Sequence, residues 1–150
     1  MLALGLCALL LAQSSPQIAV IDISADDAIY EDVSRSYAQA LADALTRLGV
    51  PSVRVDEADL PPEGCKLGPC LGALARSQGA LALVTVDAEE LTSQKSRVVV
   101  TLMRATNGEP LAGGRYELEV GKKKAPRGLS SFLTEAKRVM AKVVSPADAK

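Results

Sequence analysis

The chain has 150 residues, of which 48% are hydrophobic and only 3% are aromatic, and its formal net charge is −1. This length and composition predict one domain with a core of aliphatic side chains. The small net charge gives no overall field that would favour nucleic acid or an anionic membrane. Because the chain has no histidine, Ser–His and Cys–His nucleophile pairs, histidine general bases and most zinc sites are excluded.

The stretch from Met1 to Ala12 is almost entirely apolar. It is shorter than the ~20 residues that span a bilayer, and it resembles the hydrophobic region of a secretory signal peptide. Small residues at Ala12 and Ser14 predict cleavage before Ser15, although no Lys or Arg precedes the apolar run. A buried first strand or helix and a lipoprotein signal at Cys7 are the alternatives.

We therefore expect residues 1–14 to be a signal peptide, residues 15–144 to form a single α/β domain, and residues 145–150 to be a flexible tail. The mature protein is then periplasmic or secreted, without a transmembrane segment. Removal of the leader leaves two cysteines, Cys65 and Cys70, and an even pair in an exported chain favours a disulfide. In a cytosolic chain the same pair would be two free thiols.

After the leader, the hydrophobic patterns predict eight elements in the order β-α-β-α-β-β-β-α. They are a strand at Gln17–Ile23, a helix ending at Leu48, a half-exposed strand at Ser52–Glu57, a short helix that contains Leu71 and Ala75, strands at Leu81–Val86, Arg97–Arg104 and Tyr116–Val120, and a helix that carries Phe132 to Val143. Gly49 and Gly79 are expected to stop the first two helices. We also expect a polar turn at Glu89–Lys95, a hairpin turn at Thr106–Glu109 and a β-bulge at Gly113–Gly114.

The composition of the strands predicts their places in one sheet. Ile18–Ile23 and Leu81–Val86 are continuously apolar and should be central, whereas Val53–Val55 and Tyr116–Val120 alternate with polar residues and should be edges. Right-handed crossovers then give the strand order 2-1-3-4-5, with strand 4 antiparallel to its neighbours. The expected fold is a three-layer α/β/α sandwich around a mixed five-stranded sheet.

Three pieces of the chain resemble a group of bacterial envelope domains. They are the first strand Ile18–Ile23 with the helix that ends at Leu48-Gly49, the stretch Cys65–Val86 with its paired cysteines, and the hairpin Val98–Leu111. Together they are similar to the amino-terminal domain of TolB and to CsgG- and LpoB-like proteins. The resemblance implies an anticodon-binding-like α/β fold and a role in protein interaction in the Gram-negative envelope, without catalysis. No β-propeller and no barrel-forming strands accompany the domain here, so a TolB-like or channel role is not implied.

Two candidate sites follow from the expected topology. Ligands of open α/β sheets bind beyond the carboxyl ends of the strands, where Asp26 and Asp27 would face Asp87 and Glu89 in an acidic crevice. That crevice could hold a metal ion or a small ligand, but it has no glycine-rich phosphate loop, and acidic residues before a helix are also ordinary partners of the helix dipole.

The second candidate is the last strand and the loop after it. Tyr116, Glu117 and Leu118 would present a sheet edge to a partner, and the basic run Lys122, Lys123 and Lys124 would steer an acidic partner to it. No aromatic residue lies among these lysines to stack on bases, so nucleic-acid binding is not expected. We expect no cofactor. The favoured function is a non-enzymatic, exported protein-interaction module with an envelope protein as partner, and the alternative is a ligand-binding or catalytic pocket at the acidic crevice.

Overall fold

The computed structural model describes residues 16–23, 28–55, 60, 65, 68–119 and 129–144. Its elements are β1 (Ile18–Asp22), α2 (Ala28–Arg47), β2 (Ser52–Arg54), α3 (Gly68–Ser77), β3 (Ala82–Thr92), β4 (Lys95–Arg104), β5 (Pro110–Glu119) and α4 (Leu129–Val144). The five strands form one sheet in the order β2-β1-β3-β4-β5. β1 is parallel to β2 and β3, and β4 is antiparallel to β3 and β5. The predicted order and strand directions are confirmed.

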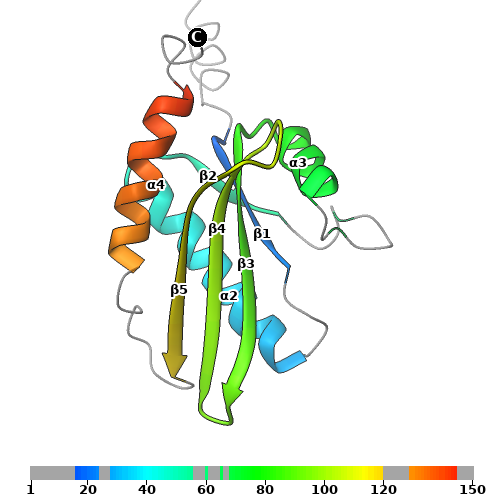
Figure 1. Ribbon diagram of the computed structural model, residues 1–150, viewed down its shortest axis with the longest axis vertical. Helices are drawn as coiled ribbons and strands as arrows, with labels where there is room; N and C mark the ends of the chain where they lie inside the picture. The colour runs from blue at the N-terminus through cyan, green and yellow to red at the C-terminus, as the bar shows by residue number, and fades with distance from the viewer. Residues whose placement is uncertain are drawn as a thin grey trace, which may run out of the picture.

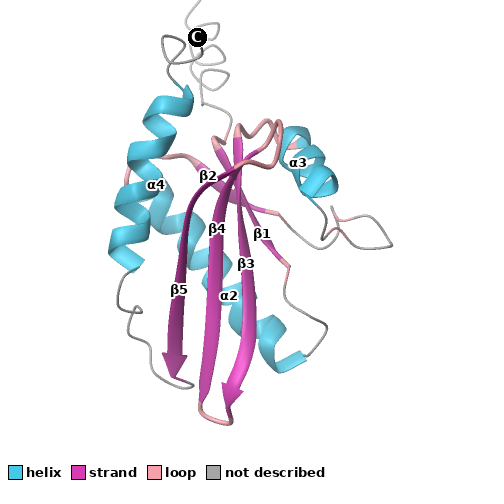
Figure 2. Cartoon of the chain, viewed as in Figure 1, coloured by secondary structure: helices cyan, strands magenta, loops and turns pink. Residues whose placement is uncertain are grey.

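The sheet lies between two layers of helix, as Figures 1 and 2 show. Helices α2 and α4 pack on one face, and α3 packs on the other. The strand β1 shows why its sequence is continuously apolar: Ile18 and Val20 enter the core under α2, while Ala19 and Ile21 enter the core under α3. A strand that is covered on both faces has no polar side to present. The predicted three-layer sandwich is confirmed.

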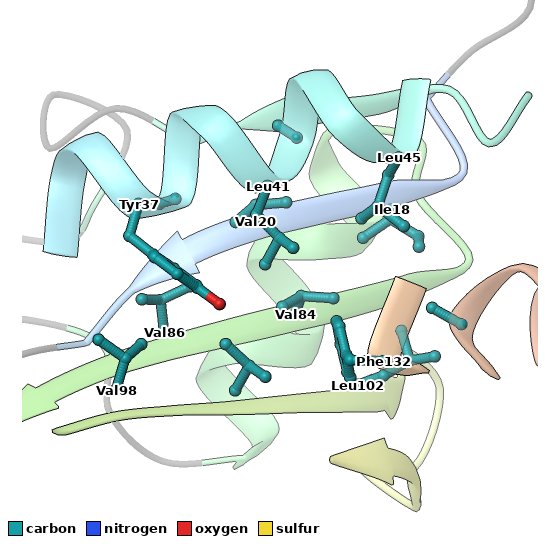
Figure 3. Close-up of a cluster of buried hydrophobic side chains, with 14 of the residues drawn as sticks. Ile18, Val20, Tyr37, Leu41, Leu45, Val84, Val86, Val98, Leu102 and Phe132 are labelled. Carbon is teal, nitrogen blue, oxygen red and sulfur yellow. The ribbon is translucent and has the colours of Figure 1, made fainter. Parts of the chain in front are cut away.

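The larger core lies between the sheet and helices α2 and α4. It brings Leu41 and Leu45 of α2 against Ile18, Val20 and Val84, and Figure 3 shows these side chains pointing toward one another across the helix–sheet boundary. The spacing of the α2 residues places them on one stripe of the helix, which is the stripe that turns toward the sheet. The smaller core under α3 includes Leu71, Leu74 and Leu83.

Two glycines end helices as the sequence predicts. Gly49 and Gly79 have φ angles of 91° and 79°, a conformation that glycine adopts without steric cost. After α2, the Val50 N–H donates to the Leu45 carbonyl (2.9 Å); after α3, the Ala80 N–H donates to the carbonyl five residues earlier (3.0 Å). Both ends are Schellman motifs, which satisfy carbonyls that a helix terminus otherwise leaves unpaired.

The hairpins differ from the expectation in two respects. First, β3 continues to Thr92, so the turn between β3 and β4 is only Ser93–Gln94. The polar residues that we expected in a loop belong instead to the exposed end of the β3 strand. Second, β5 pairs regularly with β4 through Gly113 and Gly114. The irregularity lies at Leu111, which has no β4 partner because the pair Leu102–Ala112 is followed by Met103–Pro110. The predicted bulge at the two glycines is therefore wrong.

Candidate functional site

The edge of the sheet at β5 is the first element of the candidate site. Among the described strands, β5 pairs with β4 alone and occupies the end of the sheet order. In Figure 1 the carboxyl-terminal half of β5 extends past α4 along the same side of the molecule. Strands at an edge present unpaired backbone donors and acceptors along their outer side.

The hydrogen bonds around the β4–β5 turn fix which β5 residues point outward. The Ala105 N–H donates to the Leu81 carbonyl beside β3 (3.0 Å), whereas the Arg104 N–H donates to the Glu109 carbonyl beside β5 (2.9 Å). Backbone groups in an antiparallel ladder alternate in direction from one residue to the next. The backbone N–H and C=O groups of the even-numbered β4 residues therefore point toward β5. The backbone groups of their register partners on β5 point back toward β4.

Those register partners are Gly114 and Tyr116, opposite Val100 and Val98. The residues between and after them, Gly113, Arg115 and Glu117, therefore direct their N–H and C=O groups away from β4. We call the backbone of these three residues the free edge. Each offers one donor and one acceptor at a spacing that an added strand can match.

The predicted site residue Tyr116 turns its side chain into the core. Its side chain is buried in the larger core, only 7% exposed, and a Cβ at Gly114 would overlap its hydroxyl group. Burial raises the pKa of Tyr116, and burial with the neighbouring Tyr116 raises that of Tyr37. The ring of Tyr116 is therefore not accessible to a partner, and its backbone groups face β4. Leu118 belongs to β5, and Lys122, Lys123 and Lys124 lie outside the described residues.

The sheet face opposite α2 and α4 carries the second set of predicted residues. Here Asp87 and Glu89 are exposed within β3 itself, opposite Val99 and Arg97 of β4. Arg97 forms an ion pair with Glu89 (Nη1–Oε1 3.0 Å) and stands next to Glu117 of β5 in register.

Asp26 and Asp27 lie outside the described residues, so the expected acidic crevice stays a prediction. Within the described part of the chain, no group of three His, Cys, Asp or Glu side chains could hold a metal ion. The cross-strand row Glu89–Arg97–Glu117 was not predicted. The alternation of charged residues along β3, β4 and β5 could have indicated it.

Helix α3 covers the upper part of this face in Figure 2 and leaves the lower part of β3 and β4 open. A disulfide joins Cys65 to Cys70 at the start of α3, with Cα atoms 5.6 Å apart. Further along the helix, a Cβ at Gly72 would lie 2.6 Å from the Ala105 carbonyl oxygen, to which the Arg76 guanidinium also donates. The β4–β5 turn, which leads into β5, is thus fixed against α3.

Comparison with known proteins gives structural similarity only. Neither a family model nor a curated protein matches the chain. The LpoB C-terminal domain from Salmonella enterica is similar, with a TM-score of 0.51, 14% identity, and coverage of 75% of this chain and 91% of that domain. A PelC dodecamer from Paraburkholderia phytofirmans has a TM-score of 0.51, 20% identity, and coverage of 91% and 90%. TolB from Acinetobacter baumannii has a TM-score of 0.46 and 10% identity, with coverage of 89% of this chain and 29% of TolB.

The chain therefore has the fold of the LpoB C-terminal domain and of PelC, and the resemblance to LpoB-like domains is confirmed at the level of fold. In the described part of the chain that fold is an α/β sandwich whose five-stranded sheet ends at β2 and β5. No helix in the described part of the chain is long and apolar enough to cross a bilayer.

Proposed function

We propose that the chain is a non-enzymatic, exported interaction module of the bacterial cell envelope, which binds an extended segment of an envelope protein along the free edge of β5. The location is supported by the apolar stretch Met1–Ala12 and by the disulfide Cys65–Cys70. It is also supported by the fold shared with LpoB, a type of domain that the sequence resemblance places in the envelope.

The free edge is the observation that carries the proposal. An added strand gains main-chain hydrogen bonds from Gly113, Arg115 and Glu117, while side chains of β5 select the partner. Arg115 and Glu117 are both exposed and differ in charge, so the edge discourages pairing with an arbitrary strand. The lysines at 122–124 follow directly and would raise the association rate of an acidic segment.

A catalytic or metal-binding role at the acidic residues has less support. Glu89 is engaged by Arg97 at 3.0 Å, and carboxylates neutralised by a neighbouring guanidinium are poor ligands for a cation. The chain also lacks the histidine that most hydrolytic sites use as a base.

A photocrosslinking amino acid at Glu117, on the free edge, tests the proposal in the native host, with the same amino acid at exposed Asp43 of α2 as the matched control. We expect one discrete crosslinked partner from position 117 and none from position 43. Crosslinks that form from α2 but not from β5 would contradict the proposed site.

The identified partner is then bound in purified form. Glu117→Pro removes one outward N–H, whereas Glu117→Ala keeps it, so the proline variant should bind about tenfold more weakly than the alanine variant. Equal affinities would show that backbone pairing at this position does not contribute.

A further inference from the structure

Three large apolar side chains are exposed in the described part of the chain, and they share one end of the molecule. Leu48, Leu81 and Val144 are 39%, 45% and 41% exposed. Leu48 follows the last residue of α2, and Val144 is the last residue of α4. The Leu81 N–H donates to the carbonyl of Gln17, just before β1 (3.0 Å). Figure 1 shows this end at the top of the view.

An open, mainly apolar groove of about 440 Å³ lies at this end. Its lining residues are Gln17, Gly49, Val50, Lys137, Met140, Ala141 and Val144. Val144 lines the groove, Leu48 precedes the lining residue Gly49, and Leu81 is held to the lining residue Gln17 by a backbone hydrogen bond. We call the groove and these three side chains the apolar end.

The charge at this end differs from that of the whole chain. The described segments that form it, residues 16–18, 44–52, 78–82 and 137–144, contain Arg47, Lys137, Arg138 and Lys142 but no Asp or Glu. Arg138 is paired with Glu135. Among the described residues, no ion pair joins Arg47, Lys137 or Lys142 to a carboxylate. A chain with a net charge of −1 thus places a cationic rim around its exposed apolar side chains.

We propose that the apolar end docks on the surface of a bilayer that contains anionic phospholipid. Leu48, Leu81 and Val144 enter the headgroup region, and Arg47, Lys137 and Lys142 contact lipid phosphates, with the aliphatic stems of the lysines lying on apolar surface. This arrangement binds the membrane surface reversibly and does not span it.

Charge and area favour a bilayer over a second copy of the chain. An isologous contact between two such ends would bring like charges together, which destabilises the contact. Three side chains that are each more than half covered expose far less than the ~800 Å² per partner of a standard stable interface. An anionic surface, in contrast, is complementary to the cationic rim.

The position of β1 agrees with this orientation. The apolar stretch Met1–Ala12 joins the described fold at Pro16–Gln17, and Gln17 lines the groove. Any part of that stretch that stays on the chain therefore emerges at the end that faces the membrane. The β3–β4 turn and the carboxyl end of β5 lie at the opposite end in Figure 1, where they remain open to a partner.

Co-sedimentation of the full chain with vesicles tests the proposal. Vesicles of phosphatidylglycerol and phosphatidylcholine are compared with pure phosphatidylcholine, using the wild type and a variant that combines Lys137→Gln with Lys142→Gln. Each cation near an anionic surface contributes about fivefold to binding, so the double variant should bind the anionic vesicles about 25-fold more weakly. Leu81→Ser should weaken binding further without changing its salt dependence.

The matched control makes the same change in net charge at the far end with one substitution, Lys95→Glu, and should bind as the wild type does. Because every arm contains Met1–Ala12, any contribution of that stretch cancels in the comparison. Equal loss of binding in the double variant and in Lys95→Glu, or equal binding of wild type to neutral and anionic vesicles, would overturn the proposal. It would also be overturned if sedimentation velocity showed an oligomer that Leu81→Ser dissociates, because the occupant would then be a second copy.

Discussion

The phenol ring of Tyr116 lies over Gly114, two residues earlier on the same face of β5, and takes the space that a side chain at Gly114 would occupy. The same ring is buried among Val98, Val100 and other residues of the larger core. A glycine that weakens an edge strand is thus covered by an aromatic side chain, which restores apolar contact along the strand. This relationship anchors the strand whose outer side forms the free edge.

Replacing Gly114 with alanine should destabilise the protein by about 1–3 kcal/mol, because Tyr116 must leave its position in a packed core. Gly113→Ala is the matched control, since its Cβ would lie 3.4 Å from the Val100 carbonyl oxygen, an ordinary contact. Urea denaturation measures both free energies of unfolding. Equal values for the two variants would show that the ring of Tyr116 does not occupy this place.

Tyr37 has a buried hydroxyl group with no hydrogen-bond partner in the described structure. Leaving a buried donor unpaired costs stability, so Tyr37→Phe should raise the free energy of unfolding by about 1 kcal/mol at neutral pH. A loss of similar size would mean that the hydroxyl group is hydrogen-bonded in solution.

The same residue gives a pH prediction. Burial, with the nearby Tyr116, raises the pKa of Tyr37 above its ordinary value of 10.0. Below pH 10 the hydroxyl group is protonated in both the folded and the unfolded state, so it adds no pH dependence to the free energy of unfolding. Above pH 10 that free energy falls, because the unfolded state releases the proton first. The free energy of unfolding then falls by at most about 1.4 kcal/mol per pH unit. The stability difference between Tyr37→Phe and the wild type should therefore widen from pH 10 to pH 11; a constant difference would contradict the raised pKa.

The disulfide between Cys65 and Cys70 closes a loop with a sequence separation of 5. A loop this short stabilises the fold by about 2 kcal/mol through the unfolded chain. A variant with Cys65→Ala and Cys70→Ala should lose about that much, and dithiothreitol should lower the wild type to the same level while leaving the variant unchanged. A wild type that reductant does not affect would argue against a disulfide in the isolated protein.

Export remains a prediction from residues 1–14 and has a direct measurement. Intact mass analysis of protein purified from its native host should give a chain that begins at Ser15. A full-length species that starts at Met1 and stays in the cytoplasm would contradict the envelope location. The edge of β5 would then be available to cytoplasmic partners instead.

Features that depend only on the residues of one element could be predicted from the sequence. The apolar run Ile18–Ile21 requires cover on both faces, and Gly49 and Gly79 end helices by local backbone chemistry, so these features could be predicted. The length of β3 could not, because Asp87 and Glu89 are polar residues of an open strand face and have the composition of a loop. Their place depends on partners such as Arg97 across the sheet.

For the candidate sites, the sequence could indicate which segments take part but not how their side chains are placed. That β5 is an edge follows from its alternating pattern, but the burial of Tyr116 depends on a helix some 80 residues earlier, since Tyr37 of α2 shares its core. The apolar end is assembled from β1, α2, β3 and α4, and none of these segments is unusual alone. Such sites appear only once the elements are placed together.

Amide hydrogen exchange, measured with and without the partner identified by crosslinking, tests the central claim most directly. In the free protein the amides of Gly114 and Tyr116 should be protected by β4, whereas those of Arg115 and Glu117 should exchange freely. In the complex we predict that Arg115 and Glu117 slow by at least about tenfold as a partner strand pairs with them. Protection that appears on another surface, with these two amides unchanged, would contradict binding at the free edge of β5.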